Sequence, residues 1–181
     1  MTQRQEFRVL EKFNDFEIRE YLPCVIAEVR VSANYSSASS AAFSHLFRYI
    51  SKGNRAEEAI AMTAPVIAAQ RGDKAGDDEW FVSFVMPSGS RIGDLPHPND
   101  PQVILRELDS ETCVAKSFHG RATAELSKKK TNALRIAAGK ANVKLSDETR
   151  ICRFDPPLSQ ASCSTTKSSS PPTSPECHLI F

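Results

Sequence analysis

The sequence predicts an α+β fold of duplicated ββαβ halves, whose strands form one twisted antiparallel sheet or open barrel with both helices on one side. Three observations predict it: segments of alternating apolar and polar residues, two segments with helical spacing, and the same order of elements in each half. Residues 18–21 (IREY) echo residues 105–108 (LREL), an offset of 87 from Arg19 to Arg106. A Val/Ala-rich segment and a Ser/Ala-rich helical segment follow each copy. Such a fold offers a small molecule the groove between the helices, or between one helix and the sheet.

Two segments near the start of the chain alternate in polarity. Residues 16–19 place apolar side chains at every second position, and Pro23 separates them from residues 25–31, which alternate in the same way. A period of two residues is typical of a strand with one buried and one solvent-exposed face. Residues 59–68 are apolar and are predicted to be extended, with an interruption at Pro65, because the residue before a proline disfavours the helical conformation.

Residues 35–51 have the spacing of an amphipathic helix. Ser36 or Ser37 is predicted to cap its N-terminus through the hydroxyl oxygen, and Gly53 to end it. We expect the apolar stripe of this helix to face the sheet. The stripe consists of Phe43, Leu46, Phe47 and Ile50.

The second half of the chain repeats strands and a helix. Residues 80–86 (WFVSFVM) are apolar at nearly every position, which predicts a central strand covered on both faces. Residues 103–108 and 112–118 predict two more strands, and residues 150–154 predict a last strand that two prolines stop. Residues 123–141 predict the second helix. Its apolar side consists of Leu126, Leu134, Ala137 and Ala138.

Charge and hydropathy limit the class of protein. The chain has 181 residues, with 23 Lys and Arg against 22 Asp and Glu and a net charge of +1. A nucleic-acid binder that works through bulk positive charge is not expected, because neutralising phosphates needs a basic surplus or a basic face. No apolar run is long enough for a membrane span, and no secretory signal precedes the patterned sequence. We therefore expect a soluble, cytoplasmic protein.

The composition changes near residue 158. Residues 159–181 contain 13 Ser, Thr or Pro among 23 residues, which leaves little apolar area to offset the entropy of ordering them. We therefore expect one folded domain, residues 1–158, and a Ser/Pro-rich disordered tail, residues 159–181.

The five cysteines are odd in number and widely spaced. This pattern argues against a zinc site or a disulfide framework, and no metal site is predicted. Cys24, Cys113 and Cys152 each lie beside strand-like residues, and we expect them to be small core side chains.

Seven sequence elements follow one another along residues 7–157: FEIREY (16–21), F-x-x-L-x-x-Y-I (43–50), MTAPV (62–66), FVMPS (84–88), LPHPNDPQV (95–103), FHG (118–120) and FDPP (154–157). Together they resemble the SOUL haem-binding protein family, and the combination of MTAPV with FVMPS is the specific part. The resemblance implies a twisted β-barrel flanked by two long helices, a site for haem or another tetrapyrrole, and no enzymatic chemistry. The family is similar in fold to the effector-binding domains of bacterial multidrug-responsive regulators.

The chain departs from the family pattern in two places. The family continues after the Asp-Pro-Pro element with an Arg-Arg-Asn-Glu strand, whereas Leu158 leads here into Ser/Pro-rich sequence. Either the last strand is lost or the reading frame changes near residue 158. One branch of the family carries a histidine, the iron ligand proposed there, at the position of Glu20. That axial ligand is therefore not expected in this chain.

The resemblance places the haem cleft along the first helix. Phe47 would pack on the porphyrin face and Arg48 would meet a propionate; alternatively, Phe47 is a core residue and Arg48 a solvated one. Met62 is either a soft iron ligand or a core residue. None of the four histidines is an obvious ligand, and His45 is expected to be a surface residue. The residues expected to bind haem are Phe47, Arg48, Leu46, Ile50 and Met62.

These observations favour a haem or tetrapyrrole carrier or buffer, monomeric or weakly dimeric, that holds its ligand in an apolar groove beside the first helix. The alternatives are a binding module for other hydrophobic small molecules and a protein-interaction module. No catalytic residue is predicted, because the sequence contains no nucleophile elbow, zinc-protease motif, P-loop or dinucleotide-binding motif.

Overall fold

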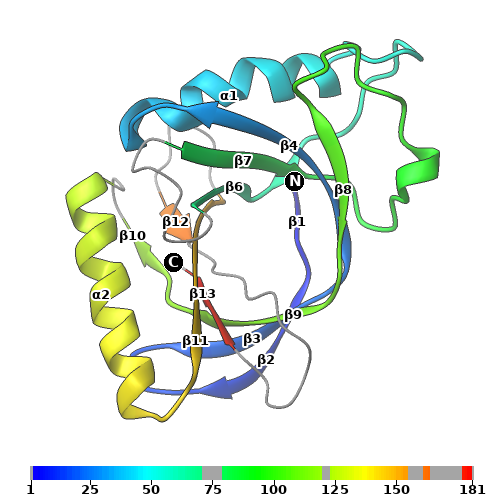
Figure 1. Cartoon of the computed structure of the whole chain (residues 1–181). Coiled ribbons are helices and arrows are strands. Elements are labelled where there is room, and N and C mark those ends of the chain that lie inside the picture. The colour runs from blue at the N-terminus through cyan, green and yellow to red at the C-terminus, as the bar shows by residue number, and fades with distance from the viewer. Residues whose placement is uncertain (1, 71–78, 120–122, 155–160, 164–176, 181) are drawn as a thin grey trace.

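The computed structural model describes residues 2–70, 79–119, 123–154, 161–163 and 177–180. Figure 1 shows a strongly curved sheet with two helices, α1 (Tyr35–Ile50) and α2 (Ala124–Lys140), against its outside. A short 3₁₀ helix, η1 (Ile92–Asp94), interrupts the loop after β7. Neither α1 nor α2 is long and apolar enough to cross a membrane, and the same holds for every other described helix. The strands are β1 (Gln3–Arg4), β2 (Phe7–Lys12), β3 (Glu17–Tyr21), β4 (Cys24–Ser32), β5 (Thr63–Ala64), β6 (Val66–Gln70), β7 (Glu79–Val85), β8 (Ile104–Leu108), β9 (Glu111–Ala115), β10 (Phe118–His119), β11 (Leu145–Arg153), β12 (Ala161–Cys163) and β13 (Cys177–Ile180).

The main sheet has the order β2-β3-β9-β13-β11-β6-β7-β4-β8, with β10 and β12 attached beside β11. Neighbouring strands are antiparallel except β13, which is parallel to both β9 and β11. Strands β1 and β5 form a separate parallel pair. The α+β fold with a twisted sheet flanked by helices is thus confirmed. The resemblance implies a twisted β-barrel, and the sheet is not closed into one, because it ends in two edges at β2 and β8.

The strand pairing exchanges partners between the two halves of the chain. Strand β3 pairs with β9 and β4 pairs with β8, while β6 pairs with β11. Two copies of one ββαβ unit related by a twofold axis would pair in this way, since the first strand of each copy meets the second strand of the other. Strand β7 lies between β4 and β6, and β13 lies in the corresponding place between β9 and β11. The internal repeat itself stays a prediction that superposition of the halves would test.

Alternate residues of each strand face the two sides of the curved sheet. On the outer face, residues of β4 and β7 such as Val29 and Val82 are fully buried against Leu46 and Tyr49 of α1. On another part of that face, Val114 of β9 meets Leu134 and Ala138 of α2. Both helices therefore cover the outer face, as predicted. The inner face has its own cluster, which includes Ile26, Ile67, Val85, Cys113 and Cys152.

The ends of α1 differ from the prediction. Asn34, and neither Ser36 nor Ser37, is the N-cap, because its Oδ1 accepts a hydrogen bond of 3.0 Å from the backbone N–H of Ser37. At the other end Lys52, with a φ of 78°, takes the left-handed conformation that was expected at Gly53. The second helix begins after Thr123, whose side chain accepts a hydrogen bond from the N–H of Leu126.

Two segments of the C-terminal region form strands. Strand β12 pairs with β10 and β11, and β13 pairs with β9 and β11. Residues 161–163 and 177–180 are thus paired as strands, while residues 159–160, 164–176 and 181 lie outside the described residues. The division into one folded domain and a disordered tail stays a prediction. Strand β11 also begins five residues earlier than the predicted position 150.

Candidate functional site

An apolar groove of about 360 Å³ lies beside α1, between that helix, strands β5 and β6, and the end of β11. Its size lies at the lower end of the range typical of small-molecule sites. A flat ligand larger than the groove would remain partly exposed at the surface. The apolar lining consists of Phe43, Met62, Ala64, Val66 and Phe154.

Aromatic residues of α1 form one wall of the groove. Phe43 lies edge-on against Phe84 of β7, with ring centroids 5.6 Å apart. The ring of Phe47, one helical turn later, stacks on Phe43 with centroids 5.5 Å apart and an angle of 12° between the planes. Phe47 is 47% exposed, so this stack extends the apolar wall from the core to the surface. A planar ring system packs well on such a surface.

The opposite wall comes from the segment before β6. The hydroxyl of Thr63 donates a hydrogen bond to the carbonyl oxygen of Val85, which fixes this segment to β7. Met62 precedes it and remains 40% exposed at the groove. The thioether of methionine is flexible and polarisable, so it adapts to ligands of different shape.

Positive charge reaches the groove from two strands. Arg153, the last residue of β11, lines it next to Phe154. The guanidinium of Arg4 in β1 lies 5.7 Å from the centroid of the Phe154 ring. Guanidinium groups bind carboxylates through paired hydrogen bonds. The groove therefore combines aromatic surfaces with a cation at one end, which suits an apolar ring that carries acidic groups.

The structure separates the five residues that the sequence assigned to haem. Leu46 and Ile50 are 0% and 4% exposed and belong to the core between α1 and the sheet. Phe47 extends the aromatic wall, and Met62 is the one residue of the five that lines the groove itself. Arg48 is not among the residues that line the groove, and its charge helps to lower the pKa of Asp100.

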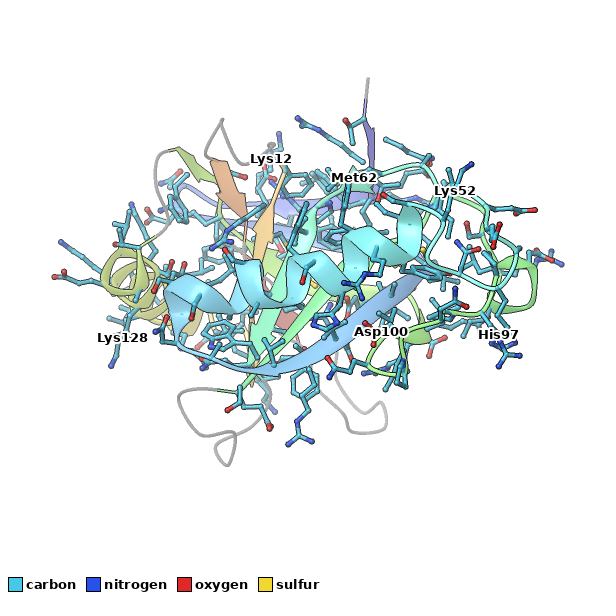
Figure 2. The ribbon with its side chains drawn as sticks, turned by 90° about the horizontal axis from the view of Figure 1, so that it is seen from above. Lys12, Lys52, Met62, His97, Asp100 and Lys128 are labelled. Carbon is cyan, nitrogen blue, oxygen red and sulfur yellow. The ribbon has the colours of Figure 1, made fainter. Side chains whose placement is uncertain are left out.

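Figure 2 shows Met62 and Asp100 on opposite sides of α1. On the Asp100 side, Nδ1 of His45 lies 2.7 Å from Oδ2 of Asp100, so His45 is paired with a carboxylate and is more than a plain surface residue. The hydrogen bond from His45, the backbone N–H of Gln102, and the charges of His45 and Arg48 lower the pKa of Asp100 below 3.8. The hydrogen bond between His45 and Asp100 holds the loop after β7 to the helix.

Other groove residues were not assigned by the sequence. Phe43 belongs to the predicted apolar stripe. It precedes Phe47 by four residues, and this spacing places the two side chains next to each other on a helix. Phe154 opens the FDPP element. Arg153 had no sequence signal, because its position depends on β11 reaching the groove beside α1.

The described histidine side chains do not line the groove: His45 pairs with Asp100, and His97 is exposed in the loop after β7. The side chains of His119 and His178 lie outside the described residues. Within the ranges that the structure describes, no group of three or more His, Cys, Asp or Glu residues is placed to hold a metal ion.

Comparison with known proteins identifies a family and a fold. The family model of the SOUL heme-binding protein matches residues 2–163. The C-terminal domain of EcmrR is similar in structure, with a TM-score of 0.63 and 12% identity over 83% of this chain and 93% of that one. EcmrR in its complex with DNA matches with a TM-score of 0.62 and 12% identity over 83% of this chain and 55% of that chain. A hydrolase from Listeria innocua matches with a TM-score of 0.51 and 9% identity over 82% of this chain and 88% of that one. A search of curated proteins returned no match, and at these identities the structural likenesses concern the fold alone.

Proposed function

The chain belongs to the SOUL heme-binding protein family, and on this premise we propose that it binds haem or a related tetrapyrrole in the groove between α1 and strands β5 and β6. The observation that carries the proposal is the aromatic groove with Arg153 at its end. A tetrapyrrole is a flat apolar ring with carboxylate arms. The aromatic side chains would contact the ring, and the guanidinium would bind a carboxylate.

The proposed site revises the sequence-based set of residues. Phe47 and Met62 stay in it, at the edge of the groove. Leu46 and Ile50 support it from beneath, because they fix α1 to the sheet. Arg153 takes the role that the sequence gave to Arg48, since Arg153 lines the groove and Arg48 does not.

Haem is held in this proposal mainly by apolar contact and charge. A bound haem would supply an iron centre, and Met62 is the groove residue that carries a soft donor atom. Replacing His45 and His97 by Ala is therefore expected to change hemin affinity by less than about tenfold.

Hemin titration of the purified full chain, followed by its Soret band, tests the site. Arg153→Gln is expected to weaken hemin binding about tenfold, whereas Arg48→Gln, the same change on the other side of α1, is expected to leave it within about twofold. If only Arg48→Gln weakens binding, the sequence-based assignment is correct and the groove assignment is wrong. A shift of the Soret maximum in Met62→Ala would identify its sulfur as an iron ligand.

The same titration separates the alternatives. If non-tetrapyrrole hydrophobic compounds compete with hemin equally well, a general module for hydrophobic ligands is the better account. Absence of saturable hemin binding would reject the haem assignment and leave a protein-interaction role. We further propose a carrier or buffer without catalytic activity, monomeric or weakly dimeric and cytoplasmic. Size-exclusion chromatography checks the oligomeric state, and microscopy of a tagged chain checks the cytoplasmic location.

A further inference from the structure

A second cavity of about 440 Å³ adjoins the apolar groove. It lies between the N-terminal segment, the turn from β3 to β4, and the start of the loop after β7. Thr63 lines both hollows. Arg4 lines the second cavity, while its guanidinium lies over the ring of Phe154 in the first. The paired strands β1 and β5 therefore form a wall between the two hollows, and Arg4 reaches both.

Charged side chains in the lining of the second cavity give it a net positive charge. Arg4 and Arg91 contribute two cations, against the single carboxylate of Glu6. Oε1 of Glu6 accepts a hydrogen bond of 3.3 Å from the hydroxyl of Ser88. Within the described part of the chain, neither arginine forms an ion pair. Both guanidinium groups thus retain donors for an incoming anion.

A tight turn brings Arg91 and two serines to this cavity. The backbone N–H of Ser90 donates to the carbonyl oxygen of Pro87 over 3.0 Å, and Gly89 takes a φ of 81°, which favours glycine. The turn places the hydroxyl-bearing residues Ser88 and Ser90 in the lining together with Arg91. Its first residues belong to the FVMPS element, for which the proposed haem site gives no role.

We propose that this second cavity binds an oxyanion, a carboxylate or a phosphate, through Arg4 and Arg91. Arginine is suited to both groups because its planar fork of N–H donors matches their pairs of oxygen atoms. The anion is either an acidic arm of the ligand whose ring occupies the apolar groove, in which case this inference rests on the proposed function, or a separate small anion.

The two sources are distinguished by comparing protoporphyrin IX with its dimethyl ester, which lacks the carboxylates. If the arm of the ligand is the anion, the full chain binds the free acid about tenfold more tightly than the ester. Arg91→Gln and Arg4→Gln each reduce this preference, and the part that remains is due to Arg153 in the apolar groove. The matched control is Arg55→Gln, an exposed arginine that lines neither cavity, and it keeps the preference.

Calorimetric titration with pyrophosphate tests the separate anion. Binding that weakens about tenfold in Arg91→Gln and not in Arg55→Gln supports the cavity, whether or not any porphyrin binds. An acid-over-ester preference that is the same in the wild type and in Arg91→Gln, together with no pyrophosphate binding, overturns the oxyanion site but leaves the proposed function standing. If no porphyrin binds at all, the proposed function fails, and the pyrophosphate result alone decides for or against the cavity.

Discussion

Gly53 lies directly against the end of α1. Its N–H donates to the carbonyl oxygen of Arg48 over 2.8 Å, and a Cβ at position 53 would lie 2.5 Å from that same oxygen. Because the contact is with backbone, Gly53→Ala is expected to destabilise the chain by about 1–3 kcal/mol.

Gly139→Ala is the matched control, since it lies in α2 with no atom within 4 Å of the added Cβ. It is expected to stabilise by about 0.5–1 kcal/mol. Urea unfolding measures both, and equal effects would contradict the steric argument.

Asp100 makes stability depend on pH. Its pKa is lower in the folded chain than 3.8, chiefly because His45 hydrogen-bonds to the carboxylate. A depressed pKa means that the ionised form stabilises the fold at pH values above 3.8, and that this contribution is lost as the pH falls through the lower, folded pKa. Asp100→Asn is expected to cost about 1–3 kcal/mol at neutral pH.

The pH dependence of that difference provides the check. The unfolding free energies of the wild type and Asp100→Asn should converge as the pH is lowered well below 3.8. The wild-type side chain is then a neutral carboxyl group, as the amide of Asn is neutral at every pH. A difference that stays constant from pH 7 down to about pH 2 would show that the carboxylate charge is not involved.

At the scale of elements, buried charges join strands across the inner face of the sheet. Arg150 of β11 is 3% exposed and donates to both carboxylate oxygens of Glu111 in β9, while its Nε lies 3.0 Å from Oε1 of Glu148. Burial by itself lowers the pKa of Arg150, but the charges of Glu111 and Glu148 outweigh it and leave the pKa raised. The guanidinium is thus a fixed cation that links two strands on either side of β13.

Removing one of the carboxylates tests this link. Glu111→Gln is expected to destabilise by about 3 kcal/mol, because it breaks a buried charge pair and leaves Arg150 with less compensation. Glu107→Gln removes an exposed carboxylate from β8 and is expected to change stability by less than about 0.5 kcal/mol. Thermal unfolding compares the two, and similar melting temperatures would show that the pair contributes little.

At the scale of the whole molecule, the last described strand completes the sheet. Strand β13 lies between β9 and β11. Without β13, the backbone groups of β9 and β11 that pair with it would have no strand partner on that side. The composition of residues 159–181 predicts that deleting them changes stability by about 1 kcal/mol or less, whereas the paired strand predicts a larger loss. Deletion of residues 177–181 is therefore expected to lower the melting temperature by roughly 4–8 °C, equivalent to about 2 kcal/mol.

A chain that lacks only Phe181 is the control for this deletion, because it keeps every residue of β13. If both deletions leave the melting temperature unchanged, β13 contributes nothing to stability, and the expectation from composition is correct for the whole tail.

Local patterns in the sequence determined most of the elements. The period-two segments became β3 and β4, the apolar run at 80–86 became the buried β7, and the two helical stripes became α1 and α2. These features follow from side-chain periodicity, which depends only on neighbours along the chain. The family resemblance also came from short local elements and is confirmed over residues 2–163.

The tertiary structure decided how those elements meet. The sheet remains open because β2 and β8 are its edges. Strand β13 pairs between β9 and β11, although the composition of its segment did not predict a strand. Arg153 reaches the groove only because β11 pairs with β6, whereas Arg48 of α1 is not among the groove residues. Such placements depend on contacts between residues far apart in sequence. The sequence by itself therefore determined most of the elements and the family, and long-range packing decided which side chains share the groove.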